Sequence, residues 1–319
     1  MKNFEQFPVR SYRPIGLGVI LVASLLLPLV ATGAQLFLWE TVLLQVVFAL
    51  SVNLLVGHSG IATFGQAAFF GIGAYAIAVT SQHGVAVSFG LIAAMILGAA
   101  ASAVVAGIAA RAEGMAVMML TLAVSQGLFS MMNRSSFMGG ANGTPVVLVD
   151  WFSTTSMAYW YSMLAISAVA AWLMWVVLRS PFGLSMRAIR DDPLRVVHFG
   201  VSVRLFRSVM FVIAGAFGGL AGGLFACTSQ AVDPSVFNWT VSGSALIMAL
   251  VGGLYSAWGP VLGATMIVLL NYYLSTLMPA LWTFFLGIVV AVVVIALPHG
   301  LISASERVRT LVNHFRRSA

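Results

Sequence analysis

Residues 179–207 read RSPFGLSMRAIRDDPLRVVHFGVSVRLFR, and this stretch separates two long apolar parts of the chain. Its arginines are Arg179, Arg187, Arg190, Arg195, Arg204 and Arg207, against only Asp191 and Asp192. Basic residues beside membrane spans are retained on the cytoplasmic side. The stretch therefore predicts a cytoplasmic loop that orients the rest of the chain and is long enough to be gripped by another protein.

The composition restricts the class of protein. Hydrophobic residues make up 61% of the 319 residues and charged residues only 7%, against about 25% charged residues in soluble domains. The apolar runs are long and continuous, whereas the strands of an outer-membrane barrel alternate over about 10 residues. The sequence therefore predicts an all-α polytopic membrane protein.

Neither the high positive charge nor the possible metal ligands indicate a further function. The pI near 10.2 does not indicate nucleic-acid binding, because the arginines lie beside predicted spans. Cys227 is the only cysteine, and the histidines are not paired at ligand spacing, so neither a disulfide nor a metal site is predicted. The histidines are His58, His83, His198, His299 and His314.

About ten transmembrane or re-entrant helices are predicted from the apolar runs. They cover residues 15–37, 40–57, 61–80, 85–110, 115–133, 157–178, 208–230, 243–257, 260–278 and 281–298. The segments 61–80 and 243–257 are the least regular and could be half-spans or re-entrant helices.

The domain organisation follows from these spans. Residues 1–14 are predicted to be a cytoplasmic N-terminal segment, 15–298 the transmembrane domain, and 299–319 a cytoplasmic basic tail. The first apolar run is longer than the core of a cleaved signal peptide, so it is interpreted as a retained helix. With the N-terminus inside and the spans alternating, every basic residue except Arg134 falls on the cytoplasmic side.

The charged loop carries its own helix signals. Asp192 followed by Pro193 is typical of an N-cap and first helical position, and Gly200 stands where a helix ends, so a short helix is predicted over 193–199. The residues expected to share one helical face before it are Leu184, Ala188 and Ile189.

Glycines mark three further places. In the seventh predicted span, Gly218/Gly222 and Gly219/Gly223 are spaced to let helix backbones approach closely. They predict helix packing, within the chain or alternatively at a subunit interface. Glycine-rich segments also lie in each half, at 57–73 and 252–263, and predict a weak two-half internal repeat with a central pathway.

Polar and charged residues limit the sources of energy that could drive transport by this chain. No carboxylate is expected in the middle of a span, which disfavours a proton-coupled carrier. Lys2 is the only lysine, so the chain contains no P-loop lysine, and ATP hydrolysis would have to come from another subunit. A stand-alone, ion-driven secondary transporter is the alternative. No residue is predicted to be catalytic, and no cofactor is predicted for this chain.

Several motifs in register carry a family resemblance. They are NLLVGHSG at 53–60, FGQAAFFGIGAY at 64–75, RAIRDD at 187–192, GGL at 252–254 with WGPVLGA at 258–264, and PHGL at 298–301. From about residue 45 to 302, the chain resembles the permease subunits of branched-chain amino acid ABC importers, LivM type. It differs from the family pattern at Gln66, where many relatives carry His, and at His299.

The resemblance implies a bacterial inner-membrane permease with both termini cytoplasmic, embedded in membrane lipid. Its expected partners are a second, LivH-like permease, two cytoplasmic ATPases that hold ATP and Mg²⁺, and a periplasmic binding protein, with no nucleic acid. The 179–207 loop would couple to an ATPase; the residues expected to act there are Arg187, Arg190, Asp191 and Asp192. Gln66 and Phe69 are weaker candidates for the translocation pathway. Urea, short amides or other amino acids are alternative substrates.

Overall fold

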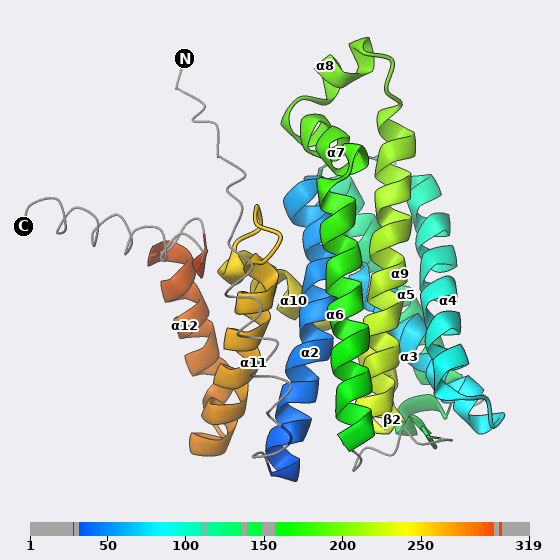
Figure 1. The fold of residues 1–319 in the computed structure, drawn as a ribbon, viewed down its shortest axis with the longest axis vertical. Coiled ribbons are helices and arrows are strands. Elements are labelled where there is room, and N and C mark those ends of the chain that lie inside the picture. The colour runs from blue at the N-terminus through cyan, green and yellow to red at the C-terminus, as the bar shows by residue number, and fades with distance from the viewer. Residues whose placement is uncertain are drawn as a thin grey trace, which may run out of the picture.

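The computed structural model describes residues 28, 32–109, 111–112, 114–135, 139–148, 157–296 and 300–301, and it is built almost entirely of helices. The α-helices are α2 Gly33–Asn53, α3 Gln66–Gln82, α4 Val87–Ala109, α5 Met115–Arg134, α6 Met157–Arg179, α7 Pro181–Asp191, α8 Pro193–His198, α9 Val203–Ser229, α10 Trp239–Gly252, α11 Gly259–Leu277 and α12 Trp282–Ala296. The short elements are the π-helix η2 Leu54–His58, the 3-10 helices η4 Gly140–Asn142 and η5 Pro234–Phe237, and the strands β1 Thr144–Pro145 and β2 Ala231–Val232. The long helices run side by side, with α7 and α8 at one end of the bundle, the α7 end, and β2 at the other, the β2 end (Figure 1).

Six helices in the described part of the chain are long and apolar enough to cross a membrane. They are α2 continued through η2, α4, α5, α6, α9 and α11. At 1.5 Å per residue, the 17 residues of α3 and the 14 of α10 span about 25 Å and 21 Å. Both are shorter than the ~30 Å hydrocarbon core of a bilayer. The polytopic helical membrane class is confirmed, and the total of ten spans stays a prediction.

The predicted boundary between the first two spans is wrong. A break was expected at residues 38–39, but α2 runs unbroken from Gly33 into η2. The backbone N–H of Thr32 donates to Gln35 Oε1 at 3.0 Å and marks the helix start. After Gly33, neither proline nor glycine occurs before Gly57, so nothing local ends the helix.

One consequence concerns Glu40, which was expected in a loop or at a span end. It lies in the second turn of α2 and its side chain is 4% exposed. Glu40 therefore lies inside a span, near its N-terminal end, and not in a loop between two spans. The N-terminal segment 1–14, most of the predicted span 15–37 and all of the tail 299–319 except residues 300–301 lie outside the described residues.

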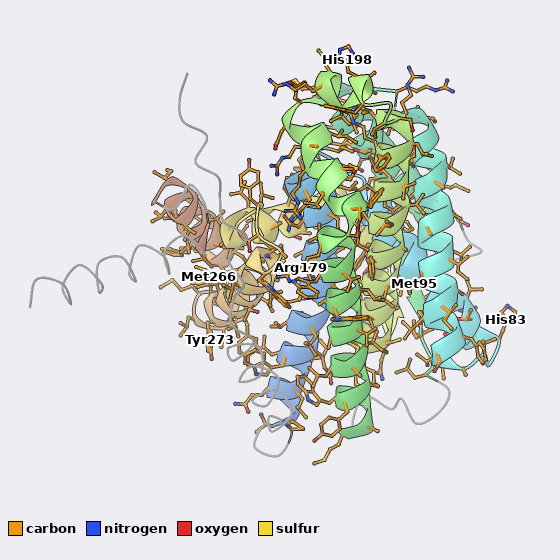
Figure 2. The ribbon with its side chains drawn as sticks, turned by 45° about the horizontal axis from the view of Figure 1, so that its top comes forward. His83, Met95, Arg179, His198, Met266 and Tyr273 are labelled. Atoms are coloured by element: carbon orange, nitrogen blue, oxygen red, sulfur yellow. The ribbon has the colours of Figure 1, made fainter. Side chains whose placement is uncertain are left out.

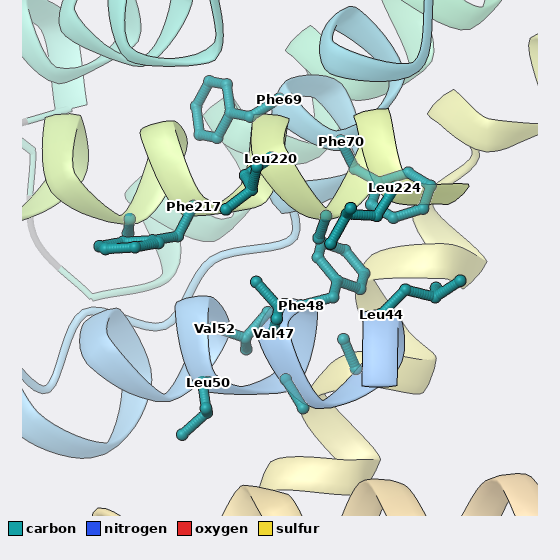
Figure 3. Close-up of a cluster of buried hydrophobic side chains, with 14 of the residues drawn as sticks. Leu44, Val47, Phe48, Leu50, Val52, Phe69, Phe70, Phe217, Leu220 and Leu224 are labelled. Carbon is teal, nitrogen blue, oxygen red and sulfur yellow. The ribbon is translucent and has the colours of Figure 1, made fainter. Parts of the chain in front are cut away.

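Helix α9 is the centre of the packing. It contacts α2, α3 and α4, and 72% of its most apolar 18-residue stretch is buried. Phe48 of α2 and Phe70 of α3 pack with ring centroids 4.6 Å apart, and Phe70 and Phe225 of α9 with centroids 5.4 Å apart. Figure 3 shows this cluster, to which α9 also contributes Phe217, Leu220 and Leu224.

The predicted packing glycines lie where α9 meets α3 and α4 of the same chain. A Cβ atom on Gly222 would overlap the carbonyl oxygen of Phe70, and one on Gly219 would overlap that of Ala94. A Cβ atom on Gly223 would lie 3.0 Å from Leu91 Cδ2, and one on Gly218 would lie 2.9 Å from Gln66 Oε1. Because glycine has no side chain, the helix backbones can approach this closely.

Two very short strands close the β2 end. Thr144 pairs with Val232 and Pro145 with Ala231, in antiparallel register. The pairing ties the turn-rich segment that follows α5 to the end of α9. The chain then turns back into the bundle through η5 before α10 begins.

Candidate functional site

Helices α3 and α10 both begin near the middle of the bundle, as their contacts with α5 show. Just before α3, the Phe64 backbone N–H donates to Thr121 Oγ1 at 3.2 Å. Just before α10, the Phe237 carbonyl accepts from Ser125 Oγ at 2.6 Å. Thr121 and Ser125 lie six and ten residues after the start of α5, about 9 Å and 15 Å along a helix of about 30 Å.

Helices α3 and α10, termed half-length because each begins inside the bundle and not at one of its ends, leave this level in opposite directions. Helix α3 runs toward the β2 end and contacts β2, whereas α10 ends next to Leu254, whose carbonyl lies against Gly57 of η2. Their first turns are joined, because the Ala67 backbone N–H donates to Ser242 Oγ at 2.7 Å. Each half-length helix follows a longer helix and a re-entrant segment, 59–65 before α3 and 230–238 before α10. Broken helices that meet at mid-depth are the usual architecture of transport sites in membrane proteins.

The repeat predicted from the sequence paired different segments from these two half-length helices. It matched 57–73 with 252–263, but the second of these joins α10 to α11 through a tight turn. The segments 57–73 and 252–263 instead touch one another, since a Cβ atom on Gly57 would overlap the Leu254 carbonyl oxygen. Close by, Asn53 at the end of α2 donates its Nδ2 to the Ser256 carbonyl at 3.1 Å. The two-half sequence repeat itself stays a prediction.

Gln66, the better of the two pathway candidates, begins α3. Its side chain is fully buried, and neither Oε1 nor Nε2 has a hydrogen-bond partner among the described residues. The amide lies against Gly218 of α9, near Ser51 of α2. Phe69, the other candidate, is 1% exposed and packs beside it. Both residues therefore lie inside the helix bundle at the level where α3 begins, and not on an open surface of the chain.

Gln66→Met tests why an amide is retained there. A buried polar group without partners costs about 1–3 kcal/mol, and methionine has a similar volume and no such cost. We expect the Tm of the purified variant to rise by a few degrees while solute uptake falls at least tenfold. Higher stability with normal uptake would remove Gln66 from the pathway. A lower Tm, close to that of Gln66→Ala, would show that the amide has partners in the folded protein.

The second feature is the two-helix cap at the α7 end, formed by α7 and α8. Ser180 Oγ accepts from the Gly183 backbone N–H at 3.3 Å and Pro181 begins α7. The Asp192 carboxylate caps α8 by accepting from the Arg195 N–H at 3.1 Å, and Pro193 begins that helix. Gly200 has φ +78° and follows its end. The helix predicted at 193–199 is therefore confirmed as α8.

The predicted face of α7 is wrong at one of its three residues. Leu184 and Ala188 share an exposed face, whereas Ile189 is buried together with Gly183 and Met186. The reason is the way α7 folds back on α6, since a Cβ atom on Gly183 would lie 2.5 Å from the Leu178 carbonyl oxygen. The glycine therefore has to point inward, and this sets the rotation of the helix. Arg204 and Arg207, expected in the loop, lie in the first turns of α9.

Arg190 joins the cap to the two glycine-rich segments. Its Nη1 donates to the Gly57 carbonyl at 2.7 Å, and its aliphatic stem packs on Gly60. Its guanidinium lies over the ring of Tyr255, 5.0 Å from the centroid, and Nη2 pairs with Asp191 Oδ1 at 2.9 Å. One side chain of α7 thus contacts the end of η2 and the turn between α10 and α11.

Arg187 also points into the protein. Its Nη2 donates to the Leu178 carbonyl at the end of α6, where a basic group complements the helix dipole. Partial burial lowers the pKa of the Arg187 guanidinium below its usual range, and the nearby Arg190 charge lowers it further. The four predicted coupling residues therefore hold the cap together: Arg187 and Arg190 face inward, Asp191 pairs with Arg190, and Asp192 caps α8.

The outer surface of the cap exposes large apolar side chains, a feature that was not predicted from the sequence. Leu194 is 77% exposed and Phe199 83% exposed, with Leu184 and Val197 also exposed. A groove between α7 and α8 is lined by Ala188, Val196, Phe199 and Val201 among polar residues. Figure 2 shows His198 at the tip of this cap, far from His83 near the β2 end. The available signal was the run of apolar residues between Asp192 and Arg204 in a loop expected to face water.

A bundle of membrane-length helices, with two half-length helices that meet at mid-depth and a helical cap at one end, is the architecture of a membrane transport protein. Among the described residues, no group of three or more His, Cys, Asp or Glu side chains could hold a metal ion. The chain belongs to the family of permease components of branched-chain amino acid transport systems, whose model matches residues 36–294.

Individual relatives agree with this assignment. The chain is 26% identical to the high-affinity branched-chain amino acid transport system permease LivM of Escherichia coli K12 and 23% identical to that of Salmonella typhimurium LT2. Each alignment covers 78% of this chain and 65% of the relative, so the chain spans about two thirds of their length. It is also 33% identical to the guanosine ABC transporter permease NupQ of Bacillus subtilis 168, over 40% of this chain and 38% of the relative. No solved structure matches the chain significantly.

Proposed function

We propose that this chain is the transmembrane permease subunit of a bacterial ABC importer for branched-chain or related hydrophobic amino acids. The observation that carries the proposal is the family match over residues 36–294, which includes both half-length helices and the α7–α8 cap. The similarity to two LivM permeases supports this substrate class. The chain would be a passive conduit whose conformations are driven from outside.

The proposed partners would complete the pathway, supply the energy and deliver the substrate. They are a second, LivH-like permease, two cytoplasmic ATPases with ATP and Mg²⁺, and a periplasmic binding protein. The chain would lie in the inner membrane with the α7 end and both termini in the cytoplasm, as the positive charge of 179–207 favours. ATP binding and hydrolysis must favour different conformations of the permease pair for transport to occur.

The cap is the proposed docking surface for an ATPase. Its outer face exposes Leu194 and Phe199 to solvent, and large exposed apolar residues rimmed by polar ones mark interaction sites. Its inner face, through Arg190, contacts the segments that lead into α3 and out of α10. Force applied to the cap would therefore reach both half-length helices.

Phe199→Asp tests this docking surface. A charge at the centre of an apolar contact is expected to cost about 2 kcal/mol or more of binding, roughly a 30-fold loss of affinity for the ATPase. The ATPase recovered with the tagged chain, and ATP-driven uptake, should fall together. Val147→Asp is the matched control, since Val147 is 64% exposed and belongs to the loop at the β2 end. Equal recovery with both variants would contradict docking at the cap.

Co-purification tests the function as a whole. The tagged chain would be purified from its native host in mild detergent and its partners identified. Two P-loop ATPases and a second permease are expected. A folded chain without any ATPase, even after cross-linking, together with sodium-driven uptake into liposomes, would support the alternative of a secondary transporter.

A nucleoside permease is the second candidate, favoured by the 33% identity to NupQ over 130 residues. The similarity to the nucleoside permease NupC of Lactococcus lactis, 26% over 117 residues, points the same way. Uptake of labelled isoleucine and labelled guanosine by the complete transporter separates the two. Urea and short amides, the other substrates considered, belong in the same assay.

A further inference from the structure

Helix α5 combines low burial with polar residues at mid-depth. Only 17% of the most apolar 18-residue stretch of α5 is buried, against 33% for the same stretch of α4 and of α6 and 28% for that of α11. Thr121 and Ser125 point into the protein and are hydrogen-bonded. Gln126, on the next position of the helix, is only half-buried, and its amide nitrogen lies 3.5 Å from Asn238 Oδ1.

The start of α10 is open on the same side. Asn238 is half-buried and caps the helix by accepting from the Thr240 N–H at 3.2 Å. Trp239 is 45% exposed and Thr240 is exposed. The ring of the half-buried Phe64 meets that of Trp239 edge to face, with centroids 6.2 Å apart. Phe64, Gln126, Asn238, Trp239 and Thr240 together form the mid-depth face.

This face differs from the surface that α4 offers to lipid. The exposed large residues of α4 are apolar along its whole length: Phe89, Ile92, Ile96, Leu97, Val104 and Ile108. Amides and hydroxyls at the centre of a bilayer need partners or water, because lipid tails offer no hydrogen bonds. The mid-depth face carries two amides and a hydroxyl where α4 carries isoleucine, so its side chains suit a wet surface.

We propose that the mid-depth face is the part of the substrate pathway that this chain contributes. Its ligand would be a small solute that combines hydrogen-bonding groups with an apolar part, such as an amino acid with an aliphatic side chain. The proposal rests on the proposed transport function. It adds the five exposed or half-buried residues of this face to the pathway candidates Gln66 and Phe69, which are buried.

The chemistry of the face fits such a solute. Gln126, Asn238 and Thr240 offer both donors and acceptors to its polar end. Phe64 and Trp239 offer aromatic surface to its apolar end. The first turn of α10 adds the positive end of a helix dipole next to these side chains, which favours an acceptor group there. Gln66 lies close to this face, at the buried start of α3, and has no hydrogen-bond partner among the described residues. Its neighbour Gly65 contacts Thr121, and its neighbour Ala67 is hydrogen-bonded to Ser242.

Cysteine accessibility tests the proposal in the complete transporter in native membranes. Cys227, the only cysteine, is buried and would first be replaced by alanine. Gln126→Cys, Thr240→Cys and the control Ile96→Cys would then be introduced singly and treated with a charged, membrane-impermeant methanethiosulfonate. Ile96 is 62% exposed on α4 at a comparable depth. Modification at 126 and 240 is expected to be at least tenfold faster than at 96.

Substrate provides the second readout. Isoleucine presented with its binding protein and ATP is expected to change the rate at Thr240→Cys at least threefold. Rates at 126 and 240 as slow as at 96 in every nucleotide state would overturn the pathway assignment. A rate that responds to guanosine but not to isoleucine would overturn the ligand class. Recovery of ATPases with the same variants is measured separately, so failure of the face is distinguishable from failure of the transport function.

Discussion

Gly222→Ala is expected to destabilise this protein strongly, although the change adds a single methyl group to a membrane helix. The Cβ atom would overlap the Phe70 carbonyl oxygen, which belongs to the backbone of α3 and cannot move as a side chain can. Helices α3 and α9 would have to separate along their contact. Overpacking in a core usually costs about 1–3 kcal/mol, and a backbone clash at the centre of the bundle belongs at the upper end of that range.

The measurement is the Tm of the purified variant in detergent, with a fall of roughly 6–12 °C expected for a loss of about 3 kcal/mol. Gly107→Ala is the matched control, because Gly107 lies in the exposed part of α4 and an added Cβ meets nothing within 4 Å. Alanine is favoured over glycine within a helix, so this control should lose no stability. Equal Tm values for both variants would contradict the close approach of α3 and α9.

Arg190→Ala is expected to reduce transport at least tenfold while leaving the ATPases bound. The side chain carries a charge-assisted hydrogen bond from the cap to Gly57 and a cation–π contact to Tyr255. Without it, movement of α7 no longer reaches the segments attached to α3 and α10. Uptake should fall at least tenfold, whereas ATP hydrolysis by the complex should continue, because the apolar surface of the cap is unchanged.

Two further variants make this result specific. Arg204→Ala removes an exposed arginine from the first turn of α9 and should transport normally. Arg190→Lys keeps the charge but has a single donor nitrogen. It should restore part of the uptake, although an ammonium cannot bond Gly57 and Asp191 with the geometry of the planar guanidinium. Normal uptake by Arg190→Ala would remove this residue from coupling, and loss of the bound ATPases would mean that it acts on docking instead.

The sequence predicted the local features well. The limits of α4, α5, α6, α11 and α12 lie within a few residues of the predicted spans, because the length of an apolar run and its glycine or polar ends are properties of neighbouring residues. The start of α8 at Pro193 follows from the Asp192 cap in the same way. The boundary predicted at residues 38–39 was wrong, because α2 continues through this point and burial in the bundle accommodates the neighbouring Glu40.

The candidate site was less predictable, because its contacts join distant residues. Arg190 bonds Gly57 across 133 positions, and Ala67 bonds Ser242 across 175. Nothing near Gln66 indicates that its side chain faces Gly218 in the interior, and nothing near Gln126 indicates that it lies beside Asn238 on an open face. The polarity of these residues was visible in the sequence, but the direction in which each side chain points was not.

The sequence by itself determined that this chain is a helical membrane protein and that its motifs resemble those of branched-chain amino acid permeases, and it predicted that the arginines gather on one side of the membrane. These conclusions follow from composition and from short patterns, which depend on residues close together in the chain. The tertiary structure alone decided that α3 and α10 start at mid-depth, that Arg190 connects the cap to both glycine-rich segments, and which polar side chains are exposed. Those features depend on how closely α9 packs against its neighbours, and the depth and rotation of each helix are set by that packing.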